Sequence, residues 1–148
     1  MPTSARLFRF RRSHVLIADD DDDFLELLGD ALQAEGHRVT RAHNGCELVD
    51  QVMASLRQPV AGERFSLVLS DIKMPGGTGL QALKSLRREK DAPPILLMTA
   101  FGSQHTHDAA MQLGAVGVID KPFDIEDFCL VVANLAEYYR PRSTLVTH

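Results

Sequence analysis

The sequence predicts an α/β protein built on one doubly wound parallel sheet. Five short apolar segments alternate with five segments of helical periodicity, a pattern that calls for parallel strands joined by right-handed helical crossovers. Several strand segments are apolar at consecutive positions, as in strands that helices cover on both faces. We therefore expect a five-stranded sheet in the flavodoxin-like order 2-1-3-4-5, with helices on both faces.

An acidic segment joins the first predicted strand to the first helix. Strand residues 15–18 run into five consecutive aspartates at residues 19–23. Those from Asp21 on suit the first turn of a helix, where free N–H groups and the helix dipole favour anions. The helix is expected to end near Gly36, because glycine is typical of the position after a helix.

The second strand is expected within residues 37–42. Asn44, with Glu47 three residues later, resembles a capping box and predicts the start of the second helix. The polar loop at residues 57–64 is longer than this connection needs.

The third predicted strand, residues 67–71, is the centre of the pattern. It is apolar at three consecutive positions, ends in Asp71 and is stopped by a cluster of proline and glycine. Thr78, with Gln81 three residues later, predicts the start of the third helix.

The fourth predicted strand, residues 95–99, ends in a hydroxyl, and Ser103 is expected to cap the fourth helix. The fifth strand, residues 116–119, leads to Lys121. A last helix with apolar residues at helical spacing reaches Tyr139.

Composition is that of one globular domain. The chain has 148 residues, of which 45% are hydrophobic and 24% charged, enough for one ordinary core. We expect a flexible basic arm at residues 1–13, one domain at residues 14–139 and a C-terminal tail at residues 140–148. No apolar run approaches the roughly 20 residues that span a bilayer, and no apolar signal core follows the first arginines. The sequence thus predicts a cytoplasmic protein without a membrane span.

The cysteines are expected to be free and structural, and two of the histidines are expected to lie on the surface. Cys46 and Cys129 are far apart and lack the spacing of a metal site, so both should be free thiols. His105 and His107 are two residues apart on a predicted helix and point to different sides, which excludes a chelating pair. Both are predicted to be surface residues.

Three predicted strands deliver charged side chains to their carboxyl ends, where open α/β sheets bind ligands. Asp19 and Asp20 follow the first strand, Asp71 ends the third and Lys121 follows the fifth. Clustered carboxylates suit Mg²⁺, and a lysine supplies a positive charge for a phosphate. An aspartate beside them can act as a nucleophile that forms an acyl phosphate.

The order and spacing of these residues resemble the CheY-like receiver domain of two-component response regulators. The resemblance covers residues 14–139 and rests on four motifs, which are the acidic pair Asp19-Asp20, Asp71 followed by Met74-Pro75-Gly76, Thr99-Ala100, and Lys121-Pro122-Phe123. It implies that the chain is a single-domain response regulator, with a receiver excised from a longer regulator as the alternative. Such a protein takes a phosphoryl group from a phosphohistidine donor and passes a signal through a protein contact.

The resemblance also implies roles for individual residues. Asp71 would be the phosphoacceptor, while Lys121 and Thr99 would contact oxygens of the phosphoryl group. Asp20 would bind Mg²⁺ directly, and Asp19 mostly through water. Asp71 and the backbone carbonyl oxygen of Lys73 would complete the magnesium ligands from the protein. The peptide bond from Lys121 to Pro122 would be cis.

The implied partners are proteins. A sensor histidine kinase or a histidine phosphotransfer protein would be the donor. The downstream partner would dock on the face formed by the fourth helix, the fifth strand and the fifth helix. No DNA-binding domain is expected, and no enzyme activity beyond autocatalytic phosphoryl acceptance and slow self-dephosphorylation.

The sequence departs from the family pattern at three positions. Val118 stands where receivers usually carry an aromatic residue that changes rotamer with the threonine. Lys73 and Phe101 occupy positions that influence hydrolysis of the acyl phosphate, and neither can orient a water molecule as an acid or amide could.

Two alternative functions, a docking domain and an enzyme, remain open at this point. A phosphorylation-independent docking domain would keep the fold but would typically lose a residue of the site. A Mg²⁺-dependent phosphatase with an aspartyl nucleophile would need a second acid two residues after it, where this chain has Lys73.

Overall fold

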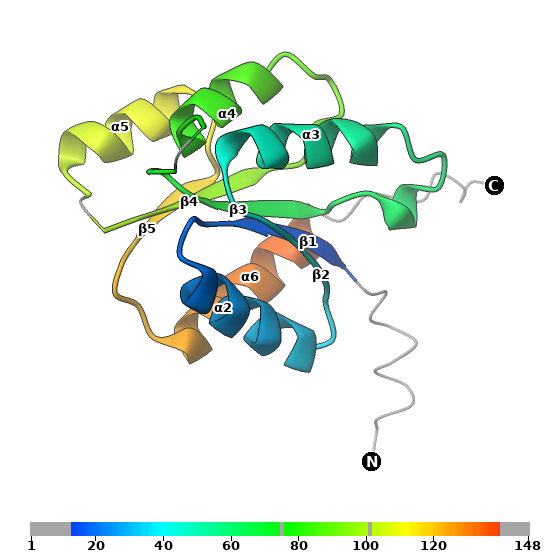
Figure 1. The fold of residues 1–148 in the computed structure, drawn as a ribbon, viewed down its shortest axis with the longest axis horizontal. Coiled ribbons are helices and arrows are strands. Elements are labelled where there is room, and N and C mark those ends of the chain that lie inside the picture. Colours follow the sequence, from blue (N-terminus) through cyan, green and yellow to red (C-terminus); the bar gives the residue numbers. More distant parts are fainter. Residues whose placement is uncertain (1–12, 75, 101, 140–148) are drawn as a thin grey trace.

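The computed structural model describes residues 13–74, 76–100 and 102–139. Their strands form one parallel sheet in the order β2-β1-β3-β4-β5, which confirms the predicted topology (Figure 1). The strands are β1 (His14–Ala18), β2 (Arg38–Ala42), β3 (Leu67–Asp71), β4 (Ile95–Thr99) and β5 (Gly117–Asp120). All but Ser13 of the predicted arm, and the whole tail at residues 140–148, lie outside the described residues, so the predicted domain limits stay a prediction.

Helices cover both faces of the sheet. The α-helices among the described residues are α2 (Asp22–Ala34), α3 (Gly45–Leu56), α4 (Gly79–Leu86), α5 (Gln104–Gln112) and α6 (Ile125–Tyr138). In Figure 1, α2 and α6 lie on one face, and α3, α4 and α5 lie on the other. A short 3-10 helix, η1 (Ala61–Glu63), occupies part of the polar loop before β3.

The core is therefore two apolar layers separated by the sheet. Successive residues of β1 alternate between them, since Leu16 packs into the layer of α3, α4 and α5 and Ile17 into the layer of α2 and α6. Both side chains are fully buried. Burying each such side chain contributes about 1.5–3 kcal/mol, which explains why the strands are apolar at consecutive positions.

The helix starts follow the predicted capping residues. Asp21 Oδ1 accepts a hydrogen bond from Phe24 N–H at 3.1 Å, and Ser103 Oγ accepts one from Thr106 N–H at 3.1 Å. The helix α4 begins with the predicted reciprocal capping box of Thr78 with Gln81.

The predicted box at α3 is only half formed. Asn44 Oδ1 accepts a hydrogen bond from Glu47 N–H at 2.8 Å. The Glu47 carboxylate, however, accepts its hydrogen bond from His43 N–H, one residue before the cap. His43 also offers a ring nitrogen to the same carboxylate oxygen, at 3.1 Å, so the glutamate is drawn toward this residue.

A cavity of about 450 Å³ lies at the amino ends of β4 and β5. Its walls include Leu86, Pro94, Leu113 and Tyr139. The ring of Tyr139 meets that of Tyr138 edge to face, with 4.8 Å between ring centroids.

Within the described residues, the helices are too short or too polar to cross a membrane.

Candidate functional site

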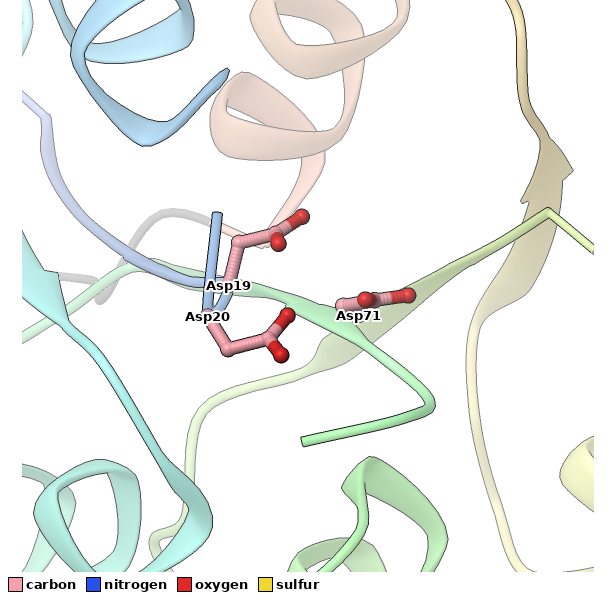
Figure 2. A group of neighbouring side chains, drawn as sticks. All are labelled: Asp19, Asp20 and Asp71. Atoms are coloured by element: carbon pink, nitrogen blue, oxygen red, sulfur yellow. The ribbon is translucent and has the colours of Figure 1, made fainter. Parts of the chain in front are cut away.

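Three aspartates meet at the carboxyl edge of the sheet. Asp19 and Asp20 come directly after β1, and Asp71 is the last residue of β3. The two strands are parallel neighbours with Ala18 paired to Ser70, so the residues after them lie side by side. Figure 2 shows the three side chains next to one another at this edge, and one oxygen of each lies within 4.8 Å of the others. The sequence prediction that these acids converge is correct.

Lys121 joins two of these carboxylates. Its Nζ donates to Asp19 Oδ2 at 2.8 Å and lies 3.6 Å from Asp71 Oδ2. The other oxygen of Asp19 accepts a hydrogen bond from Asp21 N–H at 3.0 Å. Asp19 is thus buried with a protein partner at each oxygen, whereas Asp20 is exposed to solvent.

The environment of Asp71 disfavours its negative charge. Burial raises the pKa of Asp71 above its ordinary value, and the nearby charge of Lys121 opposes this rise. The negative charges of Asp19 and Asp20 raise the pKa of Asp71 further. Neutralising this cluster with a cation would therefore favour ionised Asp71.

The donor set fits Mg²⁺. The ion prefers hard oxygen ligands, usually one or two carboxylates together with water and phosphate oxygens. Asp19, Asp20 and Asp71 each bring an oxygen to the shared space, and Asp19 also accepts a hydrogen bond from Lys121. Lys73, whose backbone carbonyl is the fourth predicted ligand, follows two residues after β3 with an exposed side chain.

Thr99 and Lys121 come from the neighbouring strand ends. Thr99 is the last residue of β4 and is buried. Lys121 N–H donates to Thr99 O at 2.7 Å, which holds the two residues side by side. The bond from Lys121 to Pro122 is cis, as the resemblance implied. The structure thus gathers the predicted side chains at one edge, although the role of each stays a prediction.

Phe24 is a neighbour of the site that the sequence did not reveal. Lys121 Nζ lies 4.4 Å from the centroid of its ring, a distance at which the face of an aromatic ring attracts a cation. The Phe24 ring also packs at 5.8 Å on Phe123, which stacks at 5.0 Å on Phe128. Helical periodicity identified Phe24 only as an apolar residue of the first helix.

Gly79 also escaped the sequence analysis. A Cβ at this position would lie 2.5 Å from Asp71 O and 3.2 Å from Ile72 Cα. The first residue of α4 therefore rests directly on the backbone that carries Asp71. From the sequence alone, the glycine-rich segment after β3 indicates only the end of the strand.

His107 differs from the prediction. His105 is an exposed surface residue as expected, but His107 Nε2 lies 2.9 Å from Asp120 Oδ1, and its side chain is only 30% exposed. The two residues are 13 positions apart on different elements, so no local pattern could have paired them. Cys46 and Cys129 are free, as predicted. Pro75 and Phe101 lie outside the described residues.

Comparison with known proteins agrees with this geometry. A family model described as the response regulator receiver domain matches residues 15–133. The response regulator protein FleR of Pseudomonas aeruginosa is 39% identical over 123 residues, which are 82% of this chain and 24% of FleR. The uncharacterised transcriptional regulatory protein YkoG of Bacillus subtilis is 34% identical over 116 residues, covering 78% of this chain and 47% of YkoG.

A solved receiver domain has the same fold. The receiver domain of the Francisella response regulator 1452 superposes with a TM-score of 0.76 at 23% identity, over 86% of this chain and 98% of that domain. The curated relatives are longer, since this chain spans about half of YkoG and about a quarter of FleR.

Proposed function

Because the chain belongs to the response regulator receiver domain family of two-component systems, we propose that Asp71 accepts a phosphoryl group from a phosphohistidine donor with the help of Mg²⁺. The observation that carries this proposal is the position of Asp71. Its carboxylate lies 3.6 Å from a lysine ammonium and shares a space less than 5 Å across with two further aspartates.

The chemical step is a displacement at phosphorus. An oxygen of Asp71 forms a bond to phosphorus while the bond from phosphorus to the donor imidazole nitrogen breaks, and that nitrogen keeps the electron pair. Such transfers depend mainly on positioning and on neutralising the charge of the phosphoryl oxygens. Lys121 supplies one positive charge at this point, and the Thr99 hydroxyl supplies a hydrogen bond.

The contacts of the aspartates support a specific set of metal ligands. Asp20 is exposed and would bind the ion directly, together with Asp71 and the Lys73 carbonyl oxygen. Asp19 has Lys121 and the Asp21 N–H on its two oxygens, so it would act through water while it orients the lysine. When bound, Mg²⁺ offsets the repulsion between these carboxylates and the incoming phosphoryl group.

The output is a protein contact on the face formed by α5, β5 and α6. Val118 of β5 is partly buried against the core layer of α3, α4 and α5, and a valine side chain has one stiff torsion. It cannot swing between buried and exposed positions as an aromatic ring would. The signal therefore leaves through the segment after Thr99 and the helix α5. A sensor histidine kinase or a histidine phosphotransfer protein supplies the phosphoryl group.

Intact mass spectrometry tests the acceptor. With acetyl phosphate and Mg²⁺ we expect a gain of one phosphoryl group in the wild type and none in Asp71→Asn. Equal labelling in EDTA, or labelling of Asp71→Asn, would contradict the assignment. Repeated turnover of a small phosphate ester would instead favour the phosphatase alternative.

Amide exchange tests the output face. Addition of beryllium fluoride, a phosphate analogue, should change protection in residues 100–114 of the wild type. A change confined to residues 22–36 would place the signal on the opposite face. Partner affinity that is the same with and without phosphorylation would favour the docking-domain alternative.

A further inference from the structure

A histidine and an aspartate join α5 to the end of β5 beside the candidate site. His107 Nε2 lies 2.9 Å from Asp120 Oδ1. Because a carboxylate only accepts hydrogen bonds, Nε2 is the donor in this contact. Asp120 directly precedes Lys121 and is paired with Thr99 in the sheet. The contact therefore ends next to two residues of the candidate site.

Gly102, in the segment between Thr99 and α5, packs against this pair. A Cβ on Gly102 would overlap Asp120 Oδ1 and would lie 2.8 Å from His107 Nε2 and 3.0 Å from Thr99 Cγ2. The backbone at Gly102 thus has no free space on the side of the pair. This contact blocks movement of the Gly102 backbone toward the pair. A shift of Gly102 in that direction therefore has to displace the Asp120 side chain from its contact with His107.

We propose that His107 and Asp120 form a latch that holds α5 to β5 before phosphorylation and opens when Asp71 carries a phosphoryl group. This inference rests on the proposed function, since Thr99 and Lys121 drive the opening as they engage the phosphoryl oxygens. Their backbones are joined by a hydrogen bond of 2.7 Å, so movement at either residue reaches both Gly102 and Asp120. His107 and Asp120 act as positioning residues.

The latch provides a link between the site and α5 that does not need an aromatic residue at position 118. Val118 lies two residues before Asp120 on the same strand. The link from the strand end to α5 instead runs through the polar pair. Its strength is modest because the side chains of His107 and Asp120 are 30% and 58% exposed. Pairs with this exposure shift an equilibrium by about 2–5-fold.

The test compares two histidines on the same helix. His107→Ala removes the latch, and His105→Ala is the matched control, because His105 is exposed two residues earlier. His107→Gln is the conservative variant, since its amide can donate to Asp120 in place of Nε2. Each full-length variant is measured for affinity toward beryllium fluoride with Mg²⁺, and for amide exchange of residues 104–112 without beryllium fluoride.

His107→Ala should bind beryllium fluoride about 2–5-fold more tightly, and its α5 amides should exchange faster in the absence of the analogue. His105→Ala should match the wild type, and His107→Gln should restore wild-type behaviour at least in part. Gly102→Ala, which forces the pair apart without removing it, should resemble His107→Ala.

The outcomes separate the two proposals. A wild type that does not respond to beryllium fluoride and Mg²⁺ would overturn the proposed function and the opening of the latch together. If the wild type responds, but His107→Ala has the same affinity and the same α5 exchange as His105→Ala, only the latch is wrong. Faster exchange in His107→Ala with unchanged affinity would mean that the pair is merely structural, which also overturns the latch.

Discussion

Lys121 Nζ donates to Asp19 Oδ2 over 2.8 Å, although the two residues are 102 positions apart in the sequence. The same ammonium lies 3.6 Å from Asp71. Asp19 therefore orients the lysine while leaving it within reach of Asp71. Under the proposed function, the two aspartates after β1 would therefore have different roles.

Substitution of Asp20 should lower the Mg²⁺ affinity more than substitution of Asp19 does. Asp20→Asn is expected to lower Mg²⁺ affinity by on the order of 100-fold, and Asp19→Asn by about 10-fold, because outer partners of a metal site have smaller effects than its ligands. Isothermal titration calorimetry measures both, and Asp22→Asn, in the first turn of α2, is the control. A larger loss in Asp19→Asn than in Asp20→Asn would reverse the assignment of the direct ligand.

Self-dephosphorylation should be slow. Lys73 offers only a hydrogen-bond donor and Phe101 is apolar, so neither side chain can orient an attacking water as a general base. The combined change Lys73→Asn with Phe101→Glu should shorten the lifetime of the phosphorylated protein, as followed by intact mass after removal of the phosphodonor. An unchanged decay rate would show that these positions do not control hydrolysis here.

Gly79 should be intolerant of a side chain. In Gly79→Ala the new Cβ meets Asp71 O at 2.5 Å, so the start of α4 and the strand end have to move apart. We expect a loss of roughly 1–3 kcal/mol in the free energy of unfolding, measured with urea, together with slower phosphorylation. Gly62→Ala is a matched control because a Cβ there meets nothing within 4 Å. Equal stability of the two variants would contradict the close approach.

His14 should make stability fall in mild acid. Burial lowers the pKa of His14, while its ring is held by Thr40 Oγ1 at 2.7 Å and packs on Phe65 at 4.5 Å between centroids. The unfolded chain then binds the proton more readily. The stabilisation is complete above the unfolded pKa of about 6.5 and is lost as the pH falls through the folded value.

Urea unfolding between pH 7.5 and 5.5 measures this dependence. His14→Gln should show a weaker pH dependence than the wild type. Burial also lowers the pKa of His37, so part of the slope should remain. His105→Gln, at an exposed position, should keep the wild-type slope. A His14→Gln protein with that same slope would show that His14 does not titrate with folding.

The fold could be predicted because its signals are local. Caps such as Thr78 with Gln81, and the apolar runs of β1 and β3, each follow from a few neighbouring residues. The aspartates and Lys121 could also be placed together, since the ends of parallel strands share one edge.

The contacts between elements could not be predicted. The pairing of His107 with Asp120 and the position of Phe24 under Lys121 depend on side-chain directions that only the packed structure sets. The end of β5 also depends on a contact with another strand. The strand was expected to end at Ile119, but Asp120 continues it by pairing with Thr99.

The tyrosine pair at the end of α6 determines what the intrinsic fluorescence of this protein can report. The chain has no tryptophan and two tyrosines. Tyr139 lines the cavity at the amino ends of β4 and β5, and the Tyr138 ring packs against its ring. Their emission therefore senses the edge of the sheet opposite Asp71. Events confined to the aspartate cluster should be optically silent, and any change in tyrosine emission on phosphorylation would record a rearrangement that has crossed the whole sheet.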